Sequence, residues 1–349
     1  MRSAAARVLL AAVAAVLVAI ATDPYPGVTI DSGEYLAVAQ GVTEGHGYTM
    51  PYLSYDEPYR VLEPSERVTM TVFPPLYPSL LAAVSVAADV SVVTAAGVVG
   101  IGVFFCVVFL VQVLVWKDTR RWWSAALAGS LLFAADLVTV HAMAWSEAVM
   151  ILAMLGALYF LRHHLETGRG ADLVLAGLCA SAAGLTRFAG IPIAFAVGAV
   201  LVTRGTPQRK RLVTAAIFCG LSVAPIAAWF VRNGVVTGYA SEKEVGWHPP
   251  SFASLVQTAE TLGSWVLPLS PAARGLGFVI LVGGVVLLVR GAPSLWQKPA
   301  ASLPRLCLIF GVSYVAFVVA ARTLLDQNIP FDTRMLAPLQ VLVLIWLAS

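Results

Sequence analysis

Long apolar runs recur along the whole chain and are separated by shorter polar segments. A helix needs about 20 mostly apolar residues to cross about 30 Å of hydrocarbon, and most of these runs approach that length. The pattern predicts ten spanning helices, near residues 4–22, 93–116, 122–140, 145–162, 171–186, 188–204, 211–231, 276–290, 304–321 and 335–348. We therefore expect an all-α polytopic membrane protein whose residues 1–349 form a single transmembrane domain.

The run 75–88 is ambiguous because it is short, begins with prolines and ends before Asp89. If it does not cross and the N-terminus is cytoplasmic, 14 of the 22 Lys and Arg residues lie in cytoplasmic segments. Counting it as a span would move Lys117, Arg120 and Arg121 outside, against the excess of basic residues on cytoplasmic loops. We expect 75–88 to dip into the membrane or lie on its outer surface.

Two long segments between predicted spans, 23–92 and 232–275, fall on the outer side in this orientation. The second contains an amphipathic stretch, 251–268, which predicts an interfacial helix. Only 3 of the 19 acidic residues are cytoplasmic, although acidic residues do not set topology. The chemistry of this protein is therefore expected on the extracytoplasmic face of the cell membrane.

Composition supports membrane insertion and excludes other classes. The chain is 59% hydrophobic and 12% charged, with a mean hydropathy of +0.84, which lies outside the range of soluble domains. A net charge of +3 gives no indication of nucleic-acid binding, and the four cysteines all lie in apolar runs without disulfide or metal-ligand spacing. Residues 8–21 resemble a signal peptide, but a retained first helix is favoured because the rest is membrane-embedded.

Asp31 and Glu34 follow the first span directly, in 30-IDSGEY-35. Asp-x-x-Glu before a helix is close to a capping box, and the residues alone favour that role. A carboxylate fixed at a helix start also has a defined direction, and near a cation it can serve as a general base. Both roles therefore stay open for Asp31.

Four other ionisable residues lie at the outer ends of predicted spans. Glu147 opens a helix and Arg187 lies in a turn between two apolar runs, while Arg232 and Arg334 end one span and begin the last. An ionisable side chain at depth costs about 2.5–3.5 kcal/mol, so such residues usually face a cavity or pair together. The alternatives are a charge on the helix dipole for Glu147, interfacial anchoring for the arginines, and a local Asp332–Arg334 pair.

The motifs occur in a recognisable order along the chain. They are Asp-x-x-Glu-Tyr after the first span, 73-FPPLYPSLLA-82, a Ser-Glu at a helix start, Leu-Thr-Arg in a turn, Arg-Asn and finally Asp-x-Arg-x-x-x-Pro. This ordered set resembles the GT-C superfamily over essentially the whole chain. These polytopic glycosyltransferases use polyprenyl-phosphate sugars, and they include protein O-mannosyltransferases and the aminoarabinose transferases of lipid A.

The resemblance implies a function and assigns residues to it. It implies inverting transfer of a hexose or pentose from a polyprenyl-phosphate donor to a protein, lipid or glycan acceptor of the cell envelope. The implied catalytic residues are Asp31 as base, Glu34 as companion acid and Glu147, and the implied donor-phosphate contacts are Arg187, Arg232 and Arg334. The first loop has no Asp-x-Asp, so no metal and no other cofactor is predicted.

Two departures from the family pattern are visible. Its Asp-Glu pair is often adjacent, whereas here Ser32 and Gly33 intervene, so the role of Asp31 is better supported than that of Glu34. The last apolar run has about 14 residues, short of the ~20 of a full span, which predicts a truncated or minimal member.

Two other classes remain as alternatives. A transporter or flippase of lipid-linked sugars would place polar residues near the bilayer midplane, often within inverted repeats, and no repeat is evident. A non-catalytic accessory protein would not need Asp31, Glu147 and Arg334 on one cavity. Their convergence in three dimensions is therefore the discriminating observation.

Overall fold

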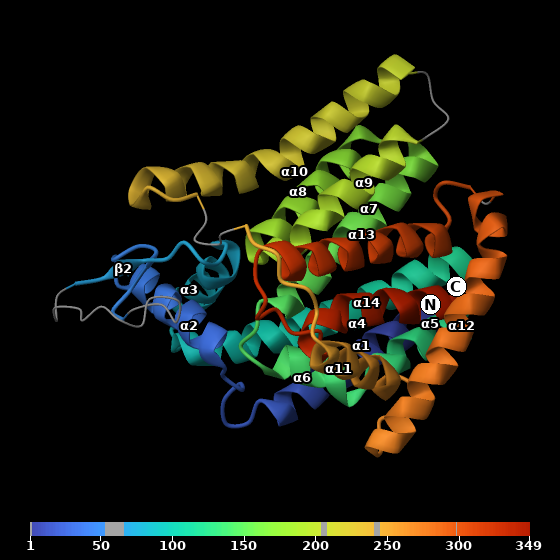
Figure 1. Cartoon of the computed structure of the whole chain (residues 1–349), viewed down its shortest axis with the longest axis horizontal. Coiled ribbons are helices and arrows are strands. Elements are labelled where there is room, and N and C mark those ends of the chain that lie inside the picture. Colours follow the sequence, from blue (N-terminus) through green and yellow to red (C-terminus); the bar gives the residue numbers. More distant parts are fainter. Residues whose placement is uncertain (1, 53–65, 204–207, 241–244, 298) are drawn as a thin grey trace.

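The computed structural model describes residues 2–52, 66–203, 208–240, 245–297 and 299–349, which form a helical bundle (Figure 1). The helices are α1 (Arg2–Ala21), α2 (Ile30–Thr43), α3 (Leu76–Ala88), α4 (Val92–Thr119), α5 (Trp122–Leu131), α6 (Ala135–Ala142), α7 (Glu147–Thr167), α8 (Gly170–Thr186), the 3-10 helix η1 (Phe188–Gly190), α9 (Ile191–Val202), α10 (Gln208–Thr237), α11 (Phe252–Ser264), α12 (Pro271–Gln297), α13 (Leu303–Leu324) and α14 (Thr333–Ala348). Two short strands, β1 (Thr49–Met50) and β2 (Val68–Thr69), pair antiparallel. The all-α prediction is confirmed.

Each predicted span coincides with one of these helices or with a pair of them. Within the described residues, α1, α4, α7, α10 and α13 are long and apolar enough to cross a membrane. The predicted span 122–140 is instead two helices, α5 and α6, bent by 65° at a short break, and this pair would be a sixth crossing. Because α3, α8, α9, α12 and α14 supply only shorter apolar stretches, the count of ten crossings stays a prediction.

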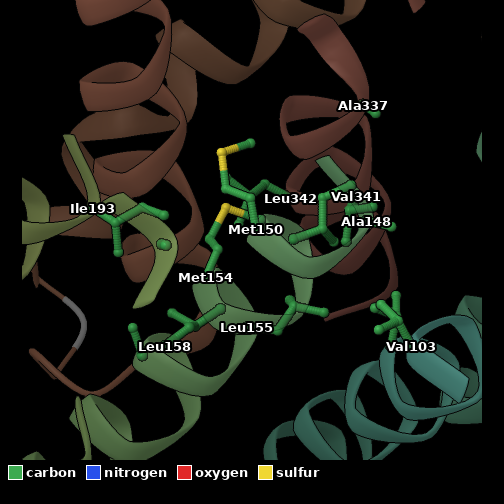
Figure 2. Packing of buried hydrophobic residues seen from close by; sticks show 14 of the residues in the cluster. Val103, Ala148, Met150, Met154, Leu155, Leu158, Ile193, Ala337, Val341 and Leu342 are labelled. Atoms are coloured by element: carbon green, nitrogen blue, oxygen red, sulfur yellow. The ribbon is translucent and has the colours of Figure 1, made fainter. Parts of the chain in front are cut away.

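The bundle core lies where α7 and α14 meet α4 and α9. Figure 2 shows Met150 and Leu158 of α7 in one apolar cluster with Leu342 of α14 and Ile193 of α9. On α4, Gly100 permits close backbone contact with α6, because a Cβ there would lie 2.1 Å from the carbonyl oxygen of His141. This rigid packing fixes the ends of α7 and α14, where the polar residues of interest lie.

The described parts of the segment 23–92 form α2, the β1–β2 hairpin and α3, which lie together at one end of the molecule (Figure 1). Tyr35 of α2 packs on Phe73 and Tyr77, with ring centroids 4.7 and 5.2 Å apart, and α3 packs in turn on α4. In the second long segment, α11 forms within the amphipathic stretch, capped by Ser251. The interfacial position of both segments stays a prediction.

Candidate active site

Asp31 lies in the first turn of α2 but does not cap it. The cap is Thr29, whose backbone N–H donates to the Ser32 hydroxyl at 3.1 Å and whose own hydroxyl lies 3.2 Å from the same oxygen. The expected capping by Asp31 and Glu34 is therefore wrong, because Thr29 begins the helix two residues earlier. The Asp31 carboxylate, 30% exposed, instead forms an ion pair with Arg334.

Arg334 joins three distant parts of the chain. Its Nη2 donates to Asp31, and its Nε donates to Oε1 of Glu147. The sequence left open a local Asp332–Arg334 pair. In the structure the Asp332 carboxylate instead caps α14 by accepting a hydrogen bond from the N–H of Met335 at 3.0 Å. Burial raises the pKa of the Asp332 carboxyl, partly offset by that hydrogen bond. Arg334 is thus directed away from its own helix toward α2 and α7.

Glu147, the first residue of α7, is fully buried between two guanidinium groups. Its Oε1 accepts from Arg334 and lies 3.1 Å from Nη1 of Arg187. Its Oε2 lies 3.5 Å from the hydroxyl of Ser146, the N-cap of α7. A single buried carboxylate therefore holds two arginines side by side.

Arg187 is positioned by the end of α8. Its backbone is extended, with φ −157°, between α8 and the short helix η1. Its Nη2 lies 3.3 Å from the sulfur of Met335, whose carbonyl accepts the hydroxyl of Tyr314 at 2.7 Å. Ion pairs join Asp31, Glu147, Arg187 and Arg334 into one unit, which is named the charged cluster below.

Aromatic and hydroxyl side chains surround the charged cluster. The Trp145 ring lies 5.0 Å from Cζ of Arg334, and its N–H donates to Thr29 at 2.9 Å. The Tyr35 hydroxyl lies 3.1 Å from that of Ser146, and burial raises the pKa of Tyr35 to about 12. Thr29, Tyr35 and Ser146 were not among the predicted site residues, although Ser146 directly precedes Glu147 in the sequence.

Two predicted site residues have other surroundings. Glu34 is buried on α2. The pKa of Tyr52 is raised mainly by burial of Tyr52 and to a smaller extent by the negative charge of Glu34. Arg232 of α10 donates to the carbonyl of Met70 at 3.2 Å and lies over the Trp229 ring at 4.7 Å. The structure thus brings Asp31, Glu147, Arg187 and Arg334 together and shows Arg232 in a separate contact beside the β-hairpin.

The charged cluster has two carboxylates and two guanidinium groups, so its formal charges balance. Both carboxylates pair with Arg334. Within the described ranges, no group of three or more His, Cys, Asp or Glu side chains is arranged to hold a metal ion. What the cluster offers a ligand is a pair of adjacent guanidinium groups, the arrangement that suits a phosphate, beside a partly exposed carboxylate.

Comparison with known proteins identifies the fold. No known family model and no curated protein sequence matches the chain. Among solved structures, ArnT from Cupriavidus metallidurans bound to undecaprenyl phosphate matches with a TM-score of 0.63 and 17% identity, covering 98% of this chain and 59% of ArnT. The S. cerevisiae protein O-mannosyltransferase Pmt1-Pmt2 complex bound to its sugar donor matches with a TM-score of 0.52 and 14% identity, covering 68% of this chain and 34% of the other.

An oligosaccharyltransferase of Archaeoglobus fulgidus, in complex with Zn and sulfate, has a TM-score of 0.54 and 12% identity, covering 98% of this chain and 48% of its own. These neighbours are glycosyltransferases, and their likeness shows that the chain has a GT-C-like fold. The five described helices that are long and apolar enough to cross a membrane indicate a multi-pass membrane protein. It spans about 59% of the length of the ArnT structure.

Proposed function

We propose that this protein transfers a hexose or pentose from a polyprenyl-phosphate donor to an acceptor on the extracytoplasmic side of the cell membrane. The observation that carries the proposal is the charged cluster, in which Glu147 pairs with two guanidinium groups and one of these, on Arg334, also pairs with the partly exposed Asp31 at the start of α2. The GT-C-like fold, and the undecaprenyl phosphate bound to the ArnT neighbour, support this choice of donor.

The two arginines would bind the donor phosphate. A guanidinium forms paired, charge-assisted hydrogen bonds to phosphate oxygens, and two adjacent guanidinium groups can neutralise a leaving phosphate. Arg187 and Arg334 are 15% and 13% exposed, so binding would occur in a partly desolvated place where such contacts are strong. Arg232, beside the hairpin, is proposed as a further contact along the donor lipid.

Asp31 would act as the general base. Its carboxylate would accept the proton of the acceptor hydroxyl as the acceptor oxygen bonds to the anomeric carbon of the sugar. The bond from that carbon to the phosphate oxygen breaks at the same time, and attack from the opposite face inverts the anomeric configuration. In the structure Asp31 is paired with Arg334. A donor phosphate competes for that guanidinium, so donor binding would free Asp31 for the acceptor; Glu34 is kept as its companion acid.

Glu147 has the surroundings of a positioning residue. Its side chain is fully buried, and its Oε1 is engaged by both arginines. Two guanidinium groups that pair with the same carboxylate are close enough to repel each other, and the negative charge of that carboxylate offsets the repulsion. We therefore assign Glu147 to holding Arg187 and Arg334 in place, in contrast to the catalytic role that the resemblance implied.

A cell that lacks this protein tests the proposal and names the sugar. The lipid-linked sugar that serves as donor should accumulate in a deletion strain, and the wild-type gene should remove it. The Asp31→Asn variant should leave the lipid at the deletion level. An unchanged pool of lipid-linked sugars on both sides of the membrane would refute the proposal, whereas a redistribution between leaflets would indicate a flippase.

A further inference from the structure

Basic side chains stack on aromatic rings at the end of the bundle away from the charged cluster. Cζ of Arg7 lies 4.7 Å from the Trp116 ring centroid, and Cζ of Arg120 lies 5.4 Å from the same centroid. Nζ of Lys117 lies 3.0 Å from the hydroxyl of Tyr159, which is about 18 Å along α7 from its first residue. Arg7, Lys117, Arg120 and Arg121 are named the basic patch.

The carboxylates near the basic patch have other partners. Asp118 and Glu166 both pair with Arg162, at 3.0 and 2.9 Å, and Asp172 pairs with His163 at 2.7 Å. Across the described part of the chain, no ion pair involves the basic patch. Its positive charge is therefore available to a ligand.

An exposed apolar surface adjoins the basic patch. Trp122 and Trp123, at the start of α5, are 65% and 51% exposed. Exposed tryptophans are typical of the part of a membrane protein that lies at the membrane–water interface. Further along, Leu9 of α1 and Leu127 of α5 are 66% and 49% exposed. Charged groups beside tryptophans, followed by apolar side chains, match the headgroup and acyl chains of one lipid.

Gln112 fixes the position of Arg7 at this surface. It is fully buried in α4 and donates from Nε2 to the carbonyl of Arg7 at 3.2 Å, which ties α1 to α4. Its Oε1 is buried and has no hydrogen-bond partner within the described residues. Arg7, Gln112 and Trp122 line a cavity of about 20 Å³, which has room for one water or hydroxyl.

We propose that the basic patch binds the phosphate of an anionic phospholipid headgroup, whose acyl chains lie along α1 and α5. Two guanidinium groups gathered around one tryptophan, without a carboxylate, form a site of the chemistry that such a headgroup requires. The site lies at the end of the bundle that the charge pattern predicts to be cytoplasmic, and it does not depend on the proposed sugar transfer.

Native mass spectrometry of the purified full chain, titrated with dioleoylphosphatidylglycerol, tests this site. The variant Arg7→Gln/Arg120→Asn removes two charges; asparagine is chosen because Arg120 has φ 56°, which asparagine tolerates. Each charge near an anionic headgroup changes affinity about fivefold, so we expect about thirtyfold weaker binding. The matched control, Arg169→Gln/Arg209→Gln, removes two exposed arginines outside the basic patch and should bind as the wild type does.

Equal affinity in the first variant and the wild type would overturn the proposal. So would an equal loss in both double variants, because that result indicates diffuse surface charge. If the first variant does not fold, the wild-type chain still decides the matter: it should retain dioleoylphosphatidylglycerol and release dioleoylglycerol, which lacks the phosphate. Equal retention of these two lipids would contradict a phosphate site.

Discussion

Replacing Glu147 by glutamine should destabilise the protein strongly, because it leaves two guanidinium groups without their shared partner. Glu147 is fully buried, with Oε1 3.1 Å from Arg187 and hydrogen-bonded to Arg334. Removing one member of a buried ion pair costs about 3–5 kcal/mol of unfolding free energy. Asp31 can offset only part of this loss, because it is 30% exposed and pairs with Arg334 alone.

The same helix supplies a matched control. Glu166 pairs with Arg162 at 2.9 Å in α7, but Glu166 is 41% exposed, and the buried Arg162 keeps a second partner, Asp118, at 3.0 Å. Loss of this partly exposed pair should therefore cost only about 0.5 kcal/mol. We therefore expect Glu147→Gln to lower the melting temperature in detergent by at least about 5 °C, and Glu166→Gln to change it by about 1 °C or less. Both variants make the same chemical change, but Glu147 is buried and pairs with two arginines, whereas Glu166 is partly exposed and pairs with one.

A double-mutant cycle identifies the cause of the loss. Arg334→Gln combined with Glu147→Gln should destabilise the protein by less than the sum of the two single changes, with a coupling energy of about 1–3 kcal/mol. Additive effects, or similar melting temperatures for Glu147→Gln and Glu166→Gln, would refute the view that Glu147 holds the arginines together.

Three further changes test other parts of the structure. Gly100→Ala should lower the free energy of unfolding by about 1–3 kcal/mol, because the added Cβ would lie 2.1 Å from the carbonyl oxygen of His141. The control Gly102→Ala meets nothing within 4 Å and should be neutral or stabilising. Equal melting temperatures of the two variants would contradict the close packing of α4 and α6. Burial raises the pKa of Tyr35 to about 12, so near pH 10 only the unfolded chain loses the phenol proton, and the free energy of unfolding falls by about 1.4 kcal/mol per pH unit between pH 10 and 12. The melting temperature of Tyr35→Phe should therefore fall less between pH 9 and 11 than that of the wild type. An equal fall in both proteins would argue against the raised pKa. Arg187→Lys keeps the positive charge but loses the planar guanidinium, so kcat/KM for the donor should fall about tenfold or more. The melting temperature should fall less in Arg187→Lys than in Arg187→Gln. An unchanged kcat/KM would exclude Arg187 from the phosphate site.

The helices could be located from the sequence because lipid and a packed bundle select the same apolar runs. The bend between α5 and α6 could not be predicted, since 122–140 is a mostly apolar run with one charged residue, Asp136, and has no proline to mark the break. The helix cap was also ambiguous, because Thr29, Asp31 and Ser32 are all capping types within four residues. Only the backbone geometry selects Thr29.

The candidate site was partly visible as a pattern of polar residues at the ends of apolar runs. Burial cost makes such residues pair, and this predicted that Glu147 and the arginines meet. Which residues meet depends on helix packing: Arg334 contacts Asp31 across 303 positions, whereas Arg232 lies on Trp229 beside the hairpin. Sequence spacing has no information on contacts of that range.

Transfer of sugar by the purified protein tests the central claim most directly. Wild-type, Asp31→Asn and Asp89→Asn proteins would be reconstituted in liposomes that contain the lipid-linked sugar found to accumulate in the deletion strain. The cell-envelope fraction of that strain would be added as the source of acceptor, and release of polyprenyl phosphate would be measured with and without it. Asp89 is an exposed aspartate with φ 53°, a conformation that asparagine tolerates, so Asp89→Asn is the matched control. We predict that Asp31→Asn abolishes release with only a small drop in melting temperature, because Arg334 keeps Glu147 as a partner, while Asp89→Asn releases at the wild-type rate. Release by Asp31→Asn at the wild-type rate would contradict the account.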